Sequence, residues 1–250
     1  MFKRLVLIFL FTPFLAFPQK EIPYQVGEYS AFDVSFGAII VGHAELEIVE
    51  EKLIDSTSTF HIVGKGKTAY FFDWFFKVRD VYETFIDTSK LLPIKFIRDI
   101  NEGPYSKKQN YFFHHSDSIV KHNDTTYKIP FNSQDMLSAF FYARTFNKEE
   151  VKKTSSFFVP IFMDEENYFL EVSYLNNEVI ETEFGKVDCM VFKPKMQEGR
   201  VFEDGEEMKI WISDDKNHLL MKVETKIWAG TIKAVLADYK ELKFPLSIIQ

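Results

Sequence analysis

Charged and apolar residues alternate along most of the chain, as in Ala44-Glu45-Leu46-Glu47-Ile48. Alternate side chains of a β-strand point to opposite faces, so this period of two predicts strands with one face in a core. Turn-forming pairs such as Asn176-Asn177 and Asp204-Gly205 separate the alternating segments. The segments predicted as strands are 44–48, 60–64, 81–87, 94–100, 109–115, 168–174, 178–184, 187–193, 208–212, 219–227 and 232–242. We therefore expect a mainly β (α+β) protein, an antiparallel meander that forms a strongly curved sheet or a partial β-barrel.

Residues 133–146 are the one segment with a clear helical pattern. Ser133 is a suitable N-cap, and Asp135 places negative charge in the first turn, where the helix dipole favours it. On a helical wheel one broad apolar face is formed by Met136, Leu137, Phe140 and Phe141, whereas Asp135, Ser138 and Tyr142 lie opposite. We expect this principal helix to pack on the concave side of the sheet.

Arg144 falls in the middle of that apolar face. An unpaired buried charge costs several kcal/mol, so a guanidinium directed at a core requires a partner. One interpretation is that Arg144, in the last turn, extends past the sheet edge into solvent and caps carbonyls there. The other is that it pairs with a carboxylate of the sheet or with an anionic ligand group in a pocket. We favour the first, which predicts an exposed Arg144 without an acidic partner.

Residues 70–76, Tyr-Phe-Phe-Asp-Trp-Phe-Phe, are apolar at nearly every position and follow neither period. They predict a short helix or loop that is buried on all sides, or a hydrophobic wedge over the end of a barrel. Aromatic residues make up 17% of the chain, which is typical of a large β-rich core and also of a cavity lined by rings. The candidate ligand-binding residues are Arg144, Phe140, Phe141, Phe72, Trp74 and Trp211.

The first residues resemble a secretory signal. Phe2-Lys3-Arg4 is a short basic start, and residues 5–17 are almost entirely apolar, which is too short a run to span a bilayer. We expect residues 1–18 to be a signal peptide, cleaved between Ala16 and Lys20, and residues 19–250 to be one β-rich exported domain. No cysteine stands at the end of the signal, and no later segment reaches transmembrane length, so we expect a soluble periplasmic or secreted protein rather than a lipoprotein.

The chain carries 30 basic and 37 acidic residues and a formal charge of −7. Loss of Lys3 and Arg4 with the signal leaves 28 basic residues and a charge of −9. An acidic surface repels phosphate backbones, so nucleic acid is not an expected partner. The only cysteine is Cys189, which excludes an intramolecular disulfide; we expect a buried, unreactive thiol in a strand.

Motifs for catalysis or metal binding are absent from the sequence. It contains no G-x-S-x-G elbow, P-loop, dinucleotide-binding glycine motif or H-E-x-x-H pair. Asp214-Asp215 is interpreted as part of a hairpin turn rather than an acid/base pair. His114, His115 and His122 are interpreted as solvent-exposed hairpin residues rather than metal ligands. We therefore expect no catalytic residues, no metal and no cofactor.

Seven short segments resemble one family. They are Gly27-Glu28-Tyr29, Phe36-Gly37 with Gly42, Leu92-Pro93, 135–144, Thr182-Glu-Phe-Gly185, Trp211-Ile-Ser-Asp-Asp215 and Gly230-Thr-Ile. In their order and spacing the chain is similar to the exported bacterial proteins grouped as domain of unknown function 3108. The resemblance implies an exported, β-rich single domain without established activity, and it matches Asp135, Ser138 and Arg144 to the family's helix motif. A looser architectural similarity is to periplasmic lipoprotein carriers, in which a curved antiparallel sheet surrounds an apolar cavity.

Three functions are consistent with these observations. The first choice is a non-catalytic binding module for an apolar or lipid-like ligand, suggested by residues 70–76, the curved sheet and Arg144. The alternative is a structural or protein-interaction module of the cell envelope, because each of these features also occurs in ordinary cores. A hydrolytic enzyme is the least favoured, since no catalytic constellation is present.

Overall fold

The computed structural model describes residues 21–195 and 207–249, whose strands form one antiparallel sheet with the order β8-β7-β6-β5-β4-β3-β2-β1-β14-β13-β12-β11-β10-β9. The first half of the sheet contains β1 (Tyr29–Phe36), β2 (Ile39–Ile54), β3 (Thr57–Thr68), β4 (Arg79–Asp87), β5 (Pro93–Glu102), β6 (Tyr105–His114), β7 (Ile119–His122) and β8 (Thr125–Lys128). The second half contains β9 (Ser156–Met163), β10 (Glu166–Thr182), β11 (Gly185–Lys195), β12 (Glu207–Ser213), β13 (Leu220–Ile227) and β14 (Gly230–Lys240). Pairing of β1 with β14 joins the two meanders.

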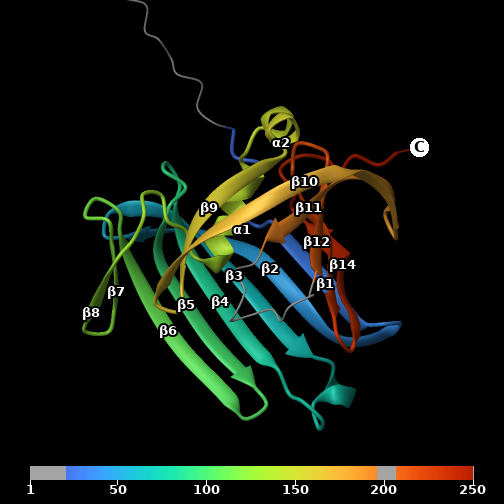
Figure 1. Cartoon of the computed structure of the whole chain (residues 1–250), viewed down its shortest axis with the longest axis horizontal. Coiled ribbons are helices and arrows are strands. Elements are labelled where there is room, and N and C mark those ends of the chain that lie inside the picture. Colours follow the sequence, from blue (N-terminus) through green and yellow to red (C-terminus); the bar gives the residue numbers. More distant parts are fainter. Residues whose placement is uncertain (1–20, 196–206, 250) are drawn as a thin grey trace, which may run out of the picture.

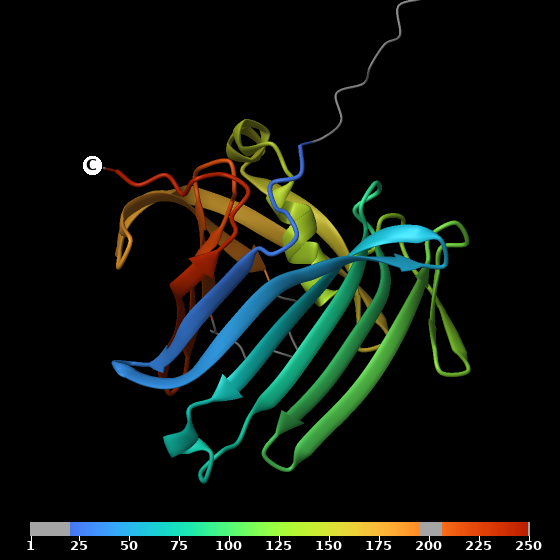
Figure 2. The same cartoon turned by 180° about the vertical axis from the view of Figure 1, so that it is seen from behind.

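The sheet curves strongly, so that its two halves face each other around a helix (Figures 1 and 2). The edge strand β9 packs against the opposite half by side chains: Phe162 belongs to one buried cluster with Phe96, Tyr111 and Phe113 of β5 and β6. Asp164, in the β9–β10 turn, forms ion pairs with Arg98 and Lys107 of the same two strands. The predicted curved sheet with a barrel-like shape is confirmed.

Helix α1 (Met136–Arg144) lies between the two halves, on the concave side, as predicted. Leu137 and Phe141 pack on the core of β2–β4, whereas Phe140 also contacts the cluster of β10–β12. Thr84 of β4 donates a hydrogen bond of 2.6 Å to the Asp135 carboxylate at the start of the helix. Burial of apolar side chains on two sides holds this short helix in place.

The helix differs from the expectation at its start and around its circumference. Asp135, not Ser133, is the N-cap, because its carboxylate accepts hydrogen bonds from the backbone N–H groups of Leu137 and Ser138. Asp135 and Ser138 are fully buried, whereas Met136 is partly exposed. A helix enclosed by two sheet halves has no continuous solvent face, and for this reason the wheel misplaced these residues.

All eleven predicted strand segments overlap strands, with one error of connection. Segments 168–174 and 178–184 belong to the single strand β10, which passes through Asn176-Asn177 with an irregular register rather than a turn. Strands β1, β7, β8 and β9 were not predicted. Helix α2 (Lys148–Thr154), which Asn147 caps, was not predicted either.

The proposed signal segment and the turn at Asp204-Gly205 lie outside the described residues. Neither α1 nor α2 has the length and apolar character needed to cross a membrane.

Candidate functional site

A cavity of about 170 Å³ lies between α1, α2 and the inner face of β9–β12. We call it the apolar pocket. Aliphatic and aromatic side chains dominate its lining: Met136, Ala139, Phe140, Ala143, Phe146, Val151, Phe157, Val159, Ile161, Leu170, Val172, Met190, Phe192, Pro194, Ile210 and Ile212. Arg144, Lys148 and His218 are the charged or polar residues that complete it.

The lining follows from the periodicity of each element. Every strand contributes alternate residues, for example Met190, Phe192 and Pro194 of β11, because every second side chain faces the concave side. From α1 come Ala139 and Ala143, four residues apart and therefore on one face of the helix. Two small side chains at the helix–sheet contact leave unfilled space there, and this space is the pocket.

Arg144 is buried where it lines the pocket, and four of its five N–H groups donate to protein acceptors. Its Nη1 and Nη2 atoms bind the two carboxylate oxygens of Glu28 at 2.6 and 3.1 Å, and Nε and Nη2 donate to the Asn217 carbonyl at 3.2 and 2.9 Å. The guanidinium also lies 5.2 Å from the centre of the Tyr24 ring. Only 4% of Arg144 is exposed, so the favoured expectation of a solvent-exposed arginine without an acidic partner is wrong. Arg144 connects α1 to the start of β1 and to the β12–β13 turn.

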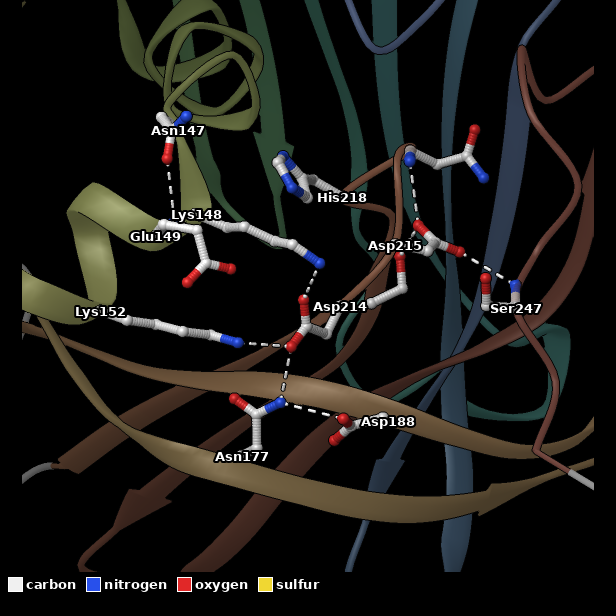
Figure 3. Close-up of polar contacts among 12 residues, drawn as sticks. Asn147, Lys148, Glu149, Lys152, Asn177, Asp188, Asp214, Asp215, His218 and Ser247 are labelled. Atoms are coloured by element: carbon white, nitrogen blue, oxygen red, sulfur yellow. Dashed lines mark hydrogen bonds and ion pairs between the residues drawn. The ribbon is translucent and has the colours of Figure 1, made fainter.

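Lys148 belongs to a polar network next to the pocket (Figure 3). Its Nζ atom lies 2.8 Å from Oδ1 of Asp214, while Lys152 Nζ lies 2.6 Å and Asn177 Nδ2 2.7 Å from Oδ2. Burial acts to raise the pKa of Asp214, but hydrogen bonds from Lys148, Lys152 and Asn177 outweigh it and hold the pKa well below its usual range. Asp214 is therefore ionised at neutral pH and fixes both lysines.

His218 lines the pocket, and one of its ring nitrogens is bound to the backbone of α1. Its Nδ1 atom lies 2.6 Å from the Arg144 carbonyl oxygen, which can only accept, so Nδ1 carries the proton. Burial lowers the pKa of His218 although the hydrogen bond to Arg144 opposes this, so the ring is neutral at pH 7. The Nε2 atom is consequently a hydrogen-bond acceptor.

The turn that carries His218 is built by the second aspartate. Asp215 accepts hydrogen bonds from Ser213 Oγ at 2.8 Å, from the Asn217 backbone at 2.9 Å and from the Ser247 backbone at 3.0 Å. The prediction that Asp214-Asp215 belongs to the turn between two strands is confirmed.

The six candidate ligand-binding residues do not form one site. Phe140 and Arg144 line the pocket, but Phe141 is buried on the β2–β4 side. Trp211 belongs to a separate core cluster, where its indole N–H donates to Glu178 at 2.9 Å. Phe72 and Trp74 lie in the β3–β4 connection and do not line the pocket.

Segment 70–76 is exposed, so the first of its two interpretations, a short helix or loop buried on all sides, is wrong. It forms the 3₁₀ helix η1 (Tyr70–Phe72) and a loop at the end of the sheet, and Trp74 is 79% exposed. Its side chains project beyond the strand ends, where no other described element covers them.

The histidines and the cysteine need one correction. Only His114 is fully exposed; His115 and His122 are half-buried and bind the Pro93 and Asn110 carbonyl oxygens. In the described ranges no group of three or more His, Cys, Asp or Glu side chains is arranged to hold a metal ion. Cys189 is buried as predicted, and its burial raises its pKa to about 12.

The candidate ligand-binding residues did not include Lys148, His218 or the strand residues that line the pocket. A signal was present in Ala139 and Ala143, whose spacing marks a helix face with little volume. Helix α2 gives no sequence signal for its part in the pocket lining, because its seven residues are mostly charged and show no apolar stripe.

Three solved structures of bacterial proteins are similar to this chain. A β-barrel-like protein of domain of unknown function DUF1849 from Brucella abortus is 9% identical, with a TM-score of 0.54, over 88% of this chain and 99% of its own. The hypothetical protein CT021 from Chlamydia trachomatis is 8% identical (TM-score 0.38; 90% and 93% covered). A putative exported protein with YmcC-like fold from Bacteroides fragilis is 11% identical (TM-score 0.32; 88% and 98% covered). At 9% identity the first likeness shows a similar fold and nothing about function. The TM-scores of the other two are too low to establish a similar fold.

No functionally curated protein matches the chain significantly. The model of one family, described as proteins of unknown function (DUF3108), matches residues 31–237, which include nearly the whole sheet and both α-helices. This match agrees with the segments identified in the sequence, among them the one that carries Asp135, Ser138 and Arg144. The chain therefore belongs to the DUF3108 family.

Proposed function

We propose that the protein is a non-catalytic binding module that holds the apolar part of a lipid-like ligand in the apolar pocket. The observation that carries this proposal is a cavity with an apolar wall and two polar groups, Lys148 and His218, at its edge. Small-molecule sites in proteins combine these two properties: apolar walls supply affinity, and a few polar groups fix orientation.

The volume limits the size of the buried group. An engineered apolar cavity of about 150 Å³ binds benzene, so a cavity of about 170 Å³ accommodates one ring or a short acyl segment. Transfer of about six methylene groups from water contributes roughly 5 kcal/mol before the cost of association is subtracted. A longer chain would have to leave the pocket through its open side.

The polar groups favour an anionic head group. Lys148 shares Asp214 with Lys152 and Asn177, so Asp214 stays compensated when Lys148 turns towards a ligand carboxylate. The acceptor Nε2 of His218 adds a place for a hydroxyl or amide N–H of the same ligand. Arg144 is assigned no part in this recognition, because Glu28 already compensates its charge and Glu28 and Asn217 accept from four of its five N–H groups.

The first test is native mass spectrometry after gentle purification, followed by binding of decanoate measured by isothermal titration calorimetry. Ala143→Leu fills the pocket from α1 and should abolish this binding. Lys148→Met should weaken decanoate by about 10- to 100-fold, the range of a charged hydrogen bond. Lys152→Met is the matched control. It also removes one lysine partner of Asp214, but Lys152 does not line the pocket, so decanoate affinity should hold.

Unchanged decanoate binding by folded Ala143→Leu would refute the pocket as the site. Absence of any co-purifying small molecule and of decanoate binding, together with a reproducible protein partner, would instead favour the interaction module of the envelope.

We also propose that the protein acts outside the cytoplasm, on the basis of the basic start and apolar run in residues 1–18. The N-terminus of protein isolated from an envelope fraction tests this proposal: cleavage between Ala16 and Lys20 is expected, and purely cytosolic protein would contradict it.

A further inference from the structure

Four neighbouring strand connections lie at one end of the sheet and carry exposed aromatic or aliphatic side chains. They are the β5–β6, β3–β4, β1–β2 and β13–β14 connections, which follow one another in the sheet order and lie along the lower edge in Figures 1 and 2. We call their exposed side chains the aromatic rim: Tyr105, Tyr70, Phe71, Trp74, Phe75, Phe76, Phe36, Ile39 and Trp228. Because consecutive strands are antiparallel, alternate hairpins bring these segments, far apart in sequence, to the same edge.

The rim concentrates the chain's exposed apolar surface. Among the large hydrophobic side chains of the described residues, the six most exposed are Tyr70, Trp228, Phe131, Trp74, Phe75 and Phe71, and all but Phe131 belong to the rim. Tyr70 is 92% and Trp228 89% exposed. Clustered exposure of this kind marks an interaction surface, whereas single exposed side chains do not.

Contacts between the connections make the rim continuous. The Phe76 ring lies so close to Gly103 of the β5–β6 turn that a Cβ there would come within 2.8 Å of it. The Phe36 ring is similarly close to Gly230 of the β13–β14 turn, where a Cβ atom would lie 3.0 Å from the ring. Between them, the Ala69 backbone N–H donates to the Val41 carbonyl at 2.9 Å. The four tips are thus fixed next to one another by the sheet and by these contacts.

The β3–β4 tip has few polar groups left to hydrate. Backbone N–H groups of Phe72, Asp73, Phe75 and Phe76 donate to carbonyls within the segment. Its one carboxylate, Asp73, turns back towards the sheet and accepts hydrogen bonds from Thr68 at 2.6 Å and from Arg79 at 3.0 and 2.5 Å. Hydrogen bonds from Arg79 and Thr68 lower the pKa of Asp73, so it stays a compensated anion. The exposed side chains of this tip are therefore mainly aromatic rings.

We propose that the aromatic rim inserts into the interfacial layer of a lipid bilayer. Tryptophan and tyrosine are enriched at membrane–water interfaces, where the apolar body of the ring is buried and its polar atom stays hydrated. Internal hydrogen bonds of four backbone N–H groups of the β3–β4 tip lower the cost of placing it in a low-dielectric layer. The rim consists of projecting tips at the end of a sheet, a shape that enters a fluid surface without a complementary groove.

Charge does not oppose insertion of the rim into a bilayer. The residues between the strands of the four connections are 37–38, 69–78, 103–104 and 228–229, and their only charged members are Asp73 and Lys77. Arg79 compensates Asp73, and Glu102 at the end of β5, next to the β5–β6 tip, offsets Lys77. The rim is therefore close to neutral in a chain whose formal charge is −7, so its rings rather than its charges would hold it in a bilayer.

Cosedimentation with vesicles of phosphatidylcholine, with and without phosphatidylglycerol, tests the proposal. The protein is purified from the producing cells, and all variants carry the same N-terminus. We expect the wild type to partition into vesicles of phosphatidylcholine, and less strongly when phosphatidylglycerol is present, because the chain as a whole is acidic. The triple variant Phe71→Ser, Trp74→Ser, Phe75→Ser should partition at least about 100-fold more weakly, since each ring that leaves water contributes about tenfold.

Phe131→Ser is the matched control. Phe131 is 81% exposed but lies in the connection between β8 and α1, outside the rim, so its loss should leave partitioning unchanged. Tryptophan emission gives an independent measurement: Trp74 and Trp228 are in the rim and Trp211 is buried, so vesicles should shift the emission to shorter wavelength.

A wild type that does not bind vesicles, or a folded triple variant that binds as strongly, would overturn the proposal. A protein partner that depends on the rim without any vesicle binding would overturn it as well. Decanoate binding is unaffected by the rim variants, because none of the three residues lines the apolar pocket. The outcome is therefore separate from that of the proposed function.

Discussion

Replacement of Arg144 by methionine should destabilise the protein far more than its position in a last helical turn suggests. Methionine retains much of the volume and the apolar contacts but leaves the Glu28 carboxylate, 4% exposed, without a cation. It also removes both donors to the Asn217 carbonyl. Removal of one partner of a buried ion pair typically lowers the free energy of unfolding by about 3–5 kcal/mol, because the remaining charge is neither hydrated nor compensated.

The second partner tests this reasoning through a double-mutant cycle. In Glu28→Met with Arg144→Met, the buried charges disappear together and the pair is replaced by apolar side chains. Such replacements are often close to neutral. We therefore expect the double variant to recover most of the stability that Arg144→Met loses, with only the Asn217 carbonyl left unsatisfied.

Urea unfolding at pH 7 measures the free energies of unfolding of the four proteins. A loss of about 3–5 kcal/mol corresponds to a fall in Tm of roughly 6–20 °C for a chain of this size. In Arg144→Met the loss should shrink as the pH falls, because the orphaned carboxyl can take up a proton and lose its charge. Two results would refute the reasoning: a change below about 1 kcal/mol for Arg144→Met, or losses that simply add in the double variant.

Two further predictions concern buried titratable groups. Burial raises the pKa of Asp135 from 3.8 to about 6, against hydrogen bonds from Ser138, Thr84 and Leu137. The folded form then binds a proton more readily than the unfolded form, so stability should rise as the pH falls from about 7 to about 4, by up to about 3 kcal/mol. In urea unfolding, Asp135→Asn should keep the cap and lose this dependence; a variant with the wild-type pH profile would exclude Asp135 as its source. Burial raises the pKa of Cys189 to about 12, so Ellman's reagent at about pH 8 should label the thiol only after unfolding. Rapid labelling of the native protein would contradict this burial.

The alternation of side chains predicted the strands whose two faces have different surroundings. It failed for β9, Ser-Phe-Phe-Val-Pro-Ile-Phe-Met, which is apolar at nearly every position. This strand packs on α1 and α2 and also places Phe162 against the opposite half of the sheet, while its outward side carries the exposed Phe158 rather than a polar residue, so no alternation marks it. Pro160 is tolerated because β9 is an edge strand of the sheet.

Asn176-Asn177 illustrates a different limit. Asparagine is common in turns because its side chain replaces backbone hydrogen bonds, but here β10 continues through the pair. The side chain of Asn177 instead binds Asp188 of β11 at 3.0 Å and Asp214 of the β12–β13 turn at 2.7 Å. Only the folded sheet brings these carboxylates within reach, so local turn chemistry gave the wrong answer.

The candidate site was predictable only in part, for the same reason. The helical wheel placed Arg144 on a buried face, and the sequence contains Glu28, yet 116 positions separate the two residues. The pocket depends on the distance between α1 and the sheet, which the sequence does not specify, and on the small volumes of Ala139 and Ala143. Phe72, Trp74 and Trp211 were grouped with Arg144 because they are aromatic, and aromatic character does not distinguish a pocket wall from a core or an exposed tip.

The ion pair and the pocket are nevertheless connected through one turn. Arg144 holds the Asn217 carbonyl with its guanidinium, and its own backbone carbonyl accepts the Nδ1–H of His218. Asp214, in the same turn, fixes Lys148. Lys148 and His218 are thus positioned by a segment that Arg144 secures, although the Arg144 charge itself is compensated by Glu28. An Arg144 variant that still folds should therefore bind decanoate more weakly, with an effect that depends on Lys148: in a Lys148→Met background the same substitution should cost little additional affinity.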